Sequence, residues 1–248
     1  MKILVTGSNG FLGKNLIARL NKDDQNDIVV FTHENTITDL EQLCANCDFV
    51  FHFAAVQRPD NTEDYMSINY ILTEAIIKSL EKNNNGCPIM FSSSIQAETD
   101  NPYGISKRAE EELFLKHKEA FDRIVYIYRF PNLFGKGAKP NYTSVVATFC
   151  YNIWRCAPIT INNPTAIINF TYIEDVLDSL VGLLKKQLIT ENNYIEIEPV
   201  YQVTLGWLAY MIGNFKDNPY SNKKINWNDE CTNKLYQTYL TYSTKSIR

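Results

Sequence analysis

The sequence has no long apolar run, no excess of positive charge and no leader-like N-terminus. Its longest apolar runs, such as residues 49–56, are far too short to span a bilayer. The N-terminus turns polar after a few residues, too early for the apolar core of a signal peptide. A net charge of −4, from 24 Lys and Arg against 28 Asp and Glu, provides no basic surface for a nucleic acid. We therefore expect a cytoplasmic protein with neither a membrane nor a nucleic acid as its partner.

Cysteine is present but poorly arranged for a metal or a disulfide framework. Cys44 and Cys47 have CxxC spacing, and the other four of the six cysteines provide no second pair. A structural zinc site normally needs two such pairs, and a chain without an export signal normally keeps its thiols reduced. We expect free thiols and no metal.

Apolar strand patterns alternate with helical patterns over the first two-thirds of the chain. This alternation is typical of a parallel sheet covered by helices. The predicted strands are at 2–6, 28–31, 48–53, 88–92 and 125–129, and the predicted helices at 11–20, 40–45, 63–82 and 103–117. We predict an α/β protein with a Rossmann-type, doubly wound parallel sheet.

The pattern changes beyond residue 131, where a smaller C-terminal lobe is predicted. The predicted elements are helices at 141–154, 173–186 and 205–215, an extended segment at 166–172 and a short strand at 194–197. We assign residues 1–132 plus about 173–188 to a dinucleotide-binding lobe. Residues of about 133–172 and 189–248 form a substrate-binding lobe and a tail, and the tail after Asp217 is interpreted as a leftover linker.

A glycine motif follows the first predicted strand. Gly7, Gly10 and Gly13 have GxxGxxG spacing directly before a predicted helix. The first glycine permits a tight turn, the second lets the backbone approach a pyrophosphate, and the third packs helix on strand. The helix N-terminus then faces the phosphates with unpaired N–H groups. This position in an alternating α/β pattern predicts a dinucleotide site.

The end of the second predicted strand bears on which nicotinamide binds. NAD-binding folds place a carboxylate there for the ribose hydroxyls. Here Thr32 and His33 precede the first carboxylate, Glu34, and both can donate hydrogen bonds to a 2′-phosphate. No arginine is present to clamp that phosphate. NADP(H) is therefore favoured, and NAD(H) remains an alternative.

A tyrosine and a lysine are placed for acid–base chemistry. Tyr103 and Lys107 are four residues apart on a predicted helix and so share one face. A nearby ammonium stabilises a phenolate, which lets Tyr103 exchange a proton with a carbonyl oxygen. The serine run at 92–94 ends the preceding strand, where a hydroxyl can hold the same carbonyl.

These features together resemble the extended short-chain dehydrogenase/reductase family, of the NAD-dependent epimerase/dehydratase type. The resemblance covers essentially residues 1–190. Beyond the motifs above, it rests on the run from His52 to Ala55, on the RxxNxxG segment at 129–135 and on a later motif at 169–175. Two positions depart from the family pattern: Thr36 replaces an adenine-binding aspartate, and Asn169 replaces a phosphate-contacting arginine.

The resemblance assigns roles to individual residues. It implies that the catalytic residues are Ser94, Tyr103 and Lys107. The residues implied for cofactor binding are Gly7, Asn9, Gly10, Phe11, Leu12, Gly13, Thr32, His33, Phe53, Ala54, Ala55, Asn69, Ser92, Tyr103, Lys107, Arg129 and Pro131. The candidate substrate contacts are Arg58, Ser94 and Asn132, although Arg58 is equally well explained as a solvated loop charge. His52 is expected to pack or bond locally.

The residues after Ser94 bear on the reaction. Dehydratases of this family carry acids there, whereas this chain has Ile95, Gln96 and Ala97. The segments at 92–97, 100–104, 126–129 and 139–151 resemble one subfamily, the reductase part of bacterial capsule and O-antigen enzymes. That resemblance implies NADPH-dependent reduction of the 4-keto group of a UDP-linked 2-acetamido-2,6-dideoxy-hexulose, for surface polysaccharide biosynthesis.

Other expectations also follow from the family. Its members commonly dimerise through the helices predicted at 63–82 and 103–117, so we expect a homodimer. The subfamily usually carries a C-terminal cupin domain, so a separate cupin-type epimerase is a candidate partner. A nucleotide-sugar 4-epimerase with retained NAD and a non-catalytic cofactor-binding protein remain as alternative functions.

Overall fold

The computed structural model describes residues 1–185, 193–216 and 225–243. The chain divides into two compact units, the first made of Met1–Phe130 and Leu177–Ile197 and the second of Pro131–Val176 and Glu198–Arg248. The sequence placed the corresponding boundaries at 132/133 and 172/173. Its third boundary, at 188/189, lies outside the described residues.

The first unit is built on a five-stranded sheet in which every pairing is parallel. Its order is β2-β1-β3-β4-β5, with bounds β1 Lys2–Thr6, β2 Asp27–Phe31, β3 Phe49–His52, β4 Ile89–Ser94 and β5 Val125–Phe130. The chain winds outward from β1 in both directions, so the order reverses between β1 and β3. Ligands of doubly wound sheets bind beyond the carboxyl ends of the strands at such a switch point.

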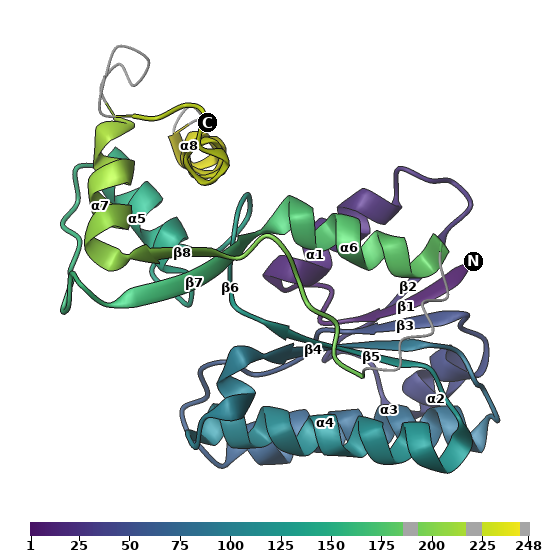
Figure 1. The fold of residues 1–248 in the computed structure, drawn as a ribbon. Coiled ribbons are helices and arrows are strands. Elements are labelled where there is room, and N and C mark those ends of the chain that lie inside the picture. Colours follow the sequence, from purple (N-terminus) through teal and green to yellow (C-terminus); the bar gives the residue numbers. More distant parts are fainter. Residues whose placement is uncertain (186–192, 217–224, 244–248) are drawn as a thin grey trace. The chain divides into compact units, whose positions relative to one another are not determined.

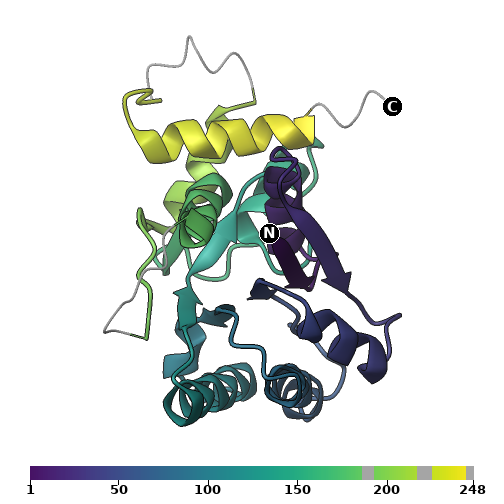
Figure 2. The same cartoon turned by 90° about the vertical axis from the view of Figure 1, so that its right-hand side faces the viewer.

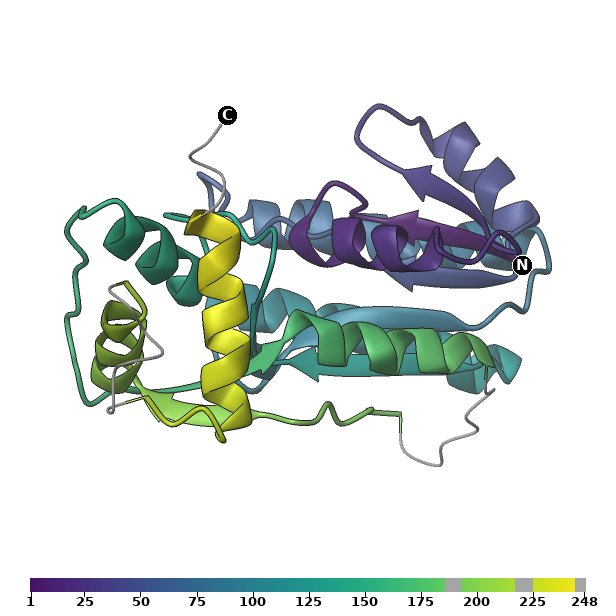
Figure 3. The same cartoon turned by 90° about the horizontal axis from the view of Figure 1, so that it is seen from above.

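Helices cover both faces of this sheet (Figure 1). One face carries α1 (Phe11–Leu20) and the part of α6 (Ile173–Lys185) that belongs to this unit, as Figure 3 shows from above. Arg19 of α1 bonds Asp178 of α6 at 2.5 Å. The other face carries α2 (Ile37–Ala45), α3 (Ile71–Lys82) and α4 (Pro102–Phe121), of which α3 and α4 are seen opposite α1 in Figure 2. Central strands are apolar on both faces, and Ile3, Leu4 and Val5 of β1 are fully buried.

Several predicted element boundaries differ from the structure for local reasons. The helix predicted at 63–82 forms as a π-helical segment, η1 (Tyr65–Tyr70), followed by α3. The helix predicted at 103–117 begins earlier because Asn101 caps it, accepting a bond from Gly104 N at 2.8 Å with proline at the first turn. The strand predicted at 194–197 is wrong: there Tyr194 forms only an isolated bridge with Ile127.

The second unit has its own small sheet and helices. β7 (Ile167–Tyr172) pairs parallel with β6 (Asn132–Phe134) and antiparallel with β8 (Tyr201–Thr204). The helices are α5 (Val145–Trp154), α7 (Leu205–Asn214) and α8 (Glu230–Ser243). The short strands β6 and β8 were not predicted.

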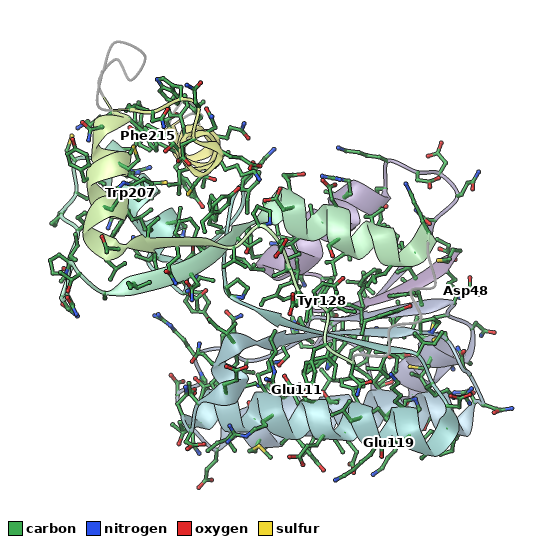
Figure 4. All side chains as sticks on the ribbon, in the orientation of Figure 1. Asp48, Glu111, Glu119, Tyr128, Trp207 and Phe215 are labelled. Carbon is green, nitrogen blue, oxygen red and sulfur yellow. The ribbon has the colours of Figure 1, made fainter. Side chains whose placement is uncertain are left out.

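The interpretation of the tail as a linker is wrong for its described part, residues 225–243. Helix α8 packs on α5 and α7 and buries Leu235, Tyr239 and Tyr242. The Tyr242 hydroxyl donates to Ala138 O at 2.6 Å, and the Tyr236 ring lies 5.2 Å from that of Phe215. Figure 4 shows Phe215 and Trp207 among the side chains of this unit. The helix is therefore part of the core of the second unit.

The described residues contain neither a membrane-spanning helix nor a cluster of metal ligands. Within residues 1–185, 193–216 and 225–243, no helix is long and apolar enough to cross a membrane. Over the same residues, no group of three or more His, Cys, Asp or Glu side chains could hold a metal ion. All six cysteines are free thiols.

Candidate active site

The glycine turn between β1 and α1 brings the backbone unusually close to the end of β3. Gly7 has φ of +66°, and a Cβ there would lie 2.6 Å from Ala54 N. A Cβ at Gly13 would lie 2.4 Å from Gly7 O. The first turn of α1 can therefore pack against the glycine turn only because residue 13 has no side chain. Gly10 precedes the helix, and no side chain caps the first turn. The turn therefore leaves N–H groups at the helix start for an anionic ligand.

The end of β3 is anchored by buried polar groups. His52 is fully buried, with Nδ1 2.7 Å from Thr6 Oγ1 and Nε2 2.9 Å from Thr73 Oγ1. Ala54 N donates to Thr6 Oγ1 at 3.1 Å. Burial, reinforced by the charge of Lys107, lowers the pKa of His52 to about 3. The ring is therefore neutral and holds the chain that leads to Phe53, Ala54 and Ala55.

His52 should make stability depend on pH in a specific window. Folded His52 stays neutral down to a pKa of about 3, whereas the unfolded residue binds a proton below its ordinary value of 6.5. Its contribution is therefore complete above pH 6.5 and is lost as the pH falls towards 3. We expect the free energy of unfolding to fall by about 2 kcal/mol between pH 7 and pH 5. Urea unfolding at the two pH values measures this loss.

A matched pair of variants separates His52 from other groups. His52→Gln should lose stability at pH 7 but show little further change at pH 5. His33→Gln removes an exposed imidazole and should keep the full wild-type dependence. Equal pH slopes in His52→Gln and wild type would contradict the assignment.

Asn69 of η1 also binds the segment that follows β3. Its Oδ1 accepts from Val56 N at 2.8 Å, and its Nδ2 donates to Val56 O at 3.3 Å. The side chain is buried, so this pair of bonds fixes the segment after β3. Asn69, predicted as a cofactor contact, thus holds the backbone of Val56, the residue directly after the predicted cofactor contacts Ala54 and Ala55.

Ser94 and Tyr103 lie on two elements that pack together. Ser94 ends β4 and caps η2 (Ile95–Glu98), accepting from Gln96 N at 3.1 Å. Helix α4 packs on η2 so closely that a Cβ at Gly104 would lie 2.1 Å from Gln96 O. The first turn of α4, with Tyr103, is therefore held against the segment that follows Ser94.

Lys107 is buried beneath Tyr103. Its side chain is 1% exposed, and its Nζ lies 4.7 Å from the centre of the Phe91 ring and 6.0 Å from that of Tyr103. Burial raises the pKa of Tyr103, while the Lys107 charge opposes that rise. Tyr103 is therefore a protonated phenol at neutral pH, the form that donates a proton.

Arg129, predicted as a cofactor contact, is bound to carboxylates. Its Nη2 lies 2.6 Å from Glu111 Oε2 and its Nη1 3.1 Å from Glu98 Oε1. Glu111 is buried and also accepts from Ser93 Oγ. Figure 4 labels Glu111 and Glu119 on α4, of which Glu111 is buried and Glu119 exposed. The ion pair joins β5 to α4 and so helps to position the helix that carries Tyr103 and Lys107. Glu111 was not predicted from the sequence, although it lies one helical turn after Lys107 and so on the same face of the helix.

The end of β2 carries the residues predicted to select the nicotinamide. Thr32 donates through both its N–H and its hydroxyl to Asn35 Oδ1, at 2.8 and 3.2 Å, and His33 is exposed. The carboxylate of Asp39 is engaged as the capping partner of Thr36, whose N–H lies 2.7 Å away, and this bonding lowers the pKa of Asp39. Glu34 is exposed. The Asp39 carboxylate is thus held at the start of α2, and the Glu34 carboxylate is exposed to solvent. Neither of the two is fixed at the end of β2, where a ribose would bind.

Three further residues were predicted to contact the substrate or the cofactor, namely Arg58, Pro131 and Asn132, and they come from two separate segments of the chain. Arg58 is exposed in the loop after β3. Pro131 and Asn132 belong to the second unit, where Asn132 Nδ2 donates to Asn169 O at 3.0 Å. Asn169, at the position of the family's arginine, accepts from Gln202 Nε2 at 3.1 Å.

Comparison with known proteins places the chain in a family. A profile described as the NAD dependent epimerase/dehydratase family matches residues 3–196. The chain belongs to this family, whose members use a nicotinamide cofactor. Three features of this structure agree with the assignment: the glycine turn, the switch point, and the position of the buried Lys107 ammonium at the Tyr103 ring.

Individual relatives give closer matches. The chain is 41% identical over 242 residues to a UDP-2-acetamido-2,6-beta-L-arabino-hexul-4-ose reductase of Pseudomonas aeruginosa, covering 98% of this chain and 65% of the relative. The structure of the capsular polysaccharide assembling protein CapF from Staphylococcus aureus matches with a TM-score of 0.88 and 34% identity, over 100% of this chain and 67% of that one. A UDP-glucuronic acid 4-epimerase of Bacillus cereus in complex with NAD shares the fold, with a TM-score of 0.84 and 19% identity. The chain thus spans about two thirds of the first two relatives.

The residues present fit a dinucleotide. The turn at Gly7, a position that only glycine can occupy, leads directly into α1. The unpaired N–H groups at the start of α1 suit a diphosphate. The Lys107 ammonium is buried, and within the described residues it makes no hydrogen bond of good geometry. A ribose hydroxyl is a suitable acceptor for such a donor.

Proposed function

We propose that the chain is a reductase of the 4-keto group of a UDP-linked 2-acetamido-2,6-dideoxy-hexulose, acting in bacterial surface polysaccharide biosynthesis. The observation that carries the proposal is the Tyr103 phenol over the buried Lys107 ammonium at the start of α4, because a protonated phenol beside an ammonium suits the reduction of a carbonyl. The substrate is taken from the name of the Pseudomonas aeruginosa relative.

The chain's own residues supply binding and the proton. The Ser94 hydroxyl donates a hydrogen bond to the C4 carbonyl oxygen and orients it. Tyr103 gives its phenolic proton to that oxygen as negative charge develops there, and Lys107 stabilises the phenolate that remains. When bound, the reduced nicotinamide supplies the hydride that completes the C4 alcohol.

NADPH is the proposed reductant, with NADH as the alternative. The support is local to the end of β2, where Asp39 is engaged at the start of α2 and Glu34 is exposed. A carboxylate fixed there would repel a 2′-phosphate, whereas the exposed His33 can donate to one. The cofactor contacts assigned from the family, including Arg129 and Pro131, belong to the same proposal.

We also propose that the protein forms a homodimer. Several apolar side chains are exposed on η1, α3 and α4, namely Met66, Ile68, Ile71 and Ile105 at 39, 45, 58 and 43%. Exposed apolar side chains gathered on neighbouring elements favour a protein interface, which supports a homodimer. A separate cupin-type epimerase is a candidate partner. The substrate-binding role of the second unit and the cytoplasmic location stay predictions.

Nicotinamide oxidation tests the proposal directly. The purified chain is given a UDP-linked 4-keto-6-deoxy-N-acetylhexosamine with NADPH or NADH, and the loss of reduced nicotinamide is followed by absorbance. We expect rapid oxidation of NADPH and a product reduced at C4. A change of sugar configuration without net oxidation would favour a 4-epimerase with retained NAD. Tight nicotinamide binding without turnover would favour the non-catalytic alternative.

A further inference from the structure

A chain of buried hydrogen bonds runs from the cofactor-facing end of β3 to helix α4. Its first members are Thr6, His52 and Thr73, with contacts of 2.7 and 2.9 Å at the two ring nitrogens. Its last step is the donation from Thr73 Oγ1 to Glu110 Oε2 at 3.0 Å. All four side chains are fully buried. None of the motifs in the sequence analysis includes Glu110.

The donors of this chain all point the same way. Ala54 N donates to Thr6 Oγ1, so the Thr6 hydroxyl proton is free to go to Nδ1 of the neutral His52 ring. The ring then carries its proton on Nε2 and donates to Thr73 Oγ1, which in turn donates to Glu110. The series of hydrogen bonds therefore ends on an acceptor oxygen of Glu110. Burial raises the pKa of this carboxyl, while the Lys107 charge and the Thr73 hydrogen bond oppose that rise and favour the ionised form.

The other oxygen of Glu110 faces the catalytic lysine. Glu110 Oε1 lies 3.3 Å from Lys107 Nζ, and the two side chains are 0 and 1% exposed. The contact is an ion pair without good hydrogen-bond geometry. An ammonium buried alone would be costly, so a buried carboxylate at this distance offsets its charge where water cannot.

We propose that Glu110 is a positioning residue that holds the Lys107 ammonium in place and keeps Tyr103 in its protonated, proton-donating form. This inference rests on the proposed reductase function. The usual arrangement of a tyrosine and a lysine alone favours the phenolate. The added carboxylate counters the lysine and favours the phenol, which is the form that a reductase consumes.

The charged groups around the pair can be named from each element that faces it. Tyr103 is faced by Lys107 and Glu110 from its own helix and by Tyr65 of η1, whose ring lies 5.6 Å away. Glu110 is also near Glu111, whose charge is paired with Arg129 of β5. His52 of β3 is neutral. The pKa of Tyr103 is lowered by Lys107 and raised by Glu110, which agrees with the geometry.

The ionisation of Tyr103 can be read without any substrate. The absorbance of tyrosinate is titrated in wild type and in Tyr103→Phe, and their difference isolates Tyr103. The same subtraction is made in the Glu110→Gln background. Glutamine has the shape of glutamate and can still accept from Thr73, so the variant removes charge and little else. We expect the Tyr103 pKa to fall by about one unit in Glu110→Gln.

A neighbouring glutamate provides the matched control. Glu112 is on the same helix but exposed, so Glu112→Gln removes the same charge where water screens it. We expect no shift of the Tyr103 pKa in this variant. An equal shift in both variants, or none in Glu110→Gln, would overturn the proposal.

The pH profile of reduction gives a second readout. The decline of kcat at alkaline pH should move to lower pH by about one unit in Glu110→Gln. If wild type reduces no UDP-sugar, the proposed function fails while the tyrosinate titration still decides the role of Glu110. If Glu110→Gln does not fold, Thr73→Val serves instead: losing the hydroxyl that stabilises the carboxylate should shift Tyr103 in the same direction. No shift in a folded Thr73→Val would then count against the proposal.

Discussion

Tyr103→Phe is expected to lower kcat for 4-keto reduction by roughly 10³-fold, because phenylalanine has no phenolic proton to give to the carbonyl oxygen. The ring itself stays, so its packing against Tyr65 and over Lys107 is kept. Nicotinamide binding should therefore change little. Steady-state kinetics with the UDP-linked 4-keto sugar, together with a fluorescence titration of NADPH, measures both quantities.

Tyr65→Phe is the control for this loss of a hydroxyl. The Tyr65 ring lies 5.6 Å from that of Tyr103, and its hydroxyl donates to Gln57 O at 3.0 Å in an exposed position. Removing it should leave kcat within a small factor of wild type. If Tyr103→Phe kept more than about a tenth of wild-type activity, Tyr103 would not be the proton donor.

Gly7→Ala is expected to destabilise the first unit by about 2–4 kcal/mol and to abolish nicotinamide binding. Two effects add. A left-handed φ of +66° is unfavourable for alanine, and its Cβ would lie 2.6 Å from the backbone nitrogen of Ala54. Backbone cannot rotate away as a side chain would, so the turn and the end of β3 must separate. Urea unfolding and NADPH titration measure the two losses.

Gly182→Ala is the control variant: it makes the same glycine-to-alanine change at a position where we expect no loss of stability. Gly182 is in α6, and a Cβ there would have no atom within 4 Å. Because alanine favours a helix over glycine, this variant should be as stable as wild type or up to about 1 kcal/mol more stable. A Gly7→Ala protein that unfolded like Gly182→Ala and still bound NADPH would contradict the role of the turn.

The features that local sequence predicts well are those that need no distant partner. The strands of the first unit are short apolar runs between turn residues, and the glycine spacing specifies a turn whose backbone other residues cannot adopt. The helix that carries Tyr103 and Lys107 was predicted at 103–117, whereas its earlier start at Pro102 follows from the Asn101 cap, which the sequence prediction did not include. The resemblance to a known family then added the catalytic roles.

The features that local sequence missed depend on contacts between distant segments. β6 and β8 have three and four residues and exist because each pairs with β7. Helix α8 looked like a polar tail because four of the six buried residues on it are threonines or tyrosines, with only Cys231 and Leu235 besides. Tyr239 becomes core only because the rings of Trp154 and Phe215 surround it, at 6.1 and 5.8 Å.

The candidate site divides in the same way. The sequence by itself determined that a tyrosine and a lysine share a helix face and that a glycine turn precedes α1, because both depend on spacing within one segment. Only the tertiary structure decided which carboxylate meets the lysine. Glu110 and Glu111 are adjacent in sequence, but Thr73 of α3 binds the first and Arg129 of β5 binds the second. Those partners are about 20 to 40 residues away in the chain, and only the packing of α3 and β5 on α4 brings them there.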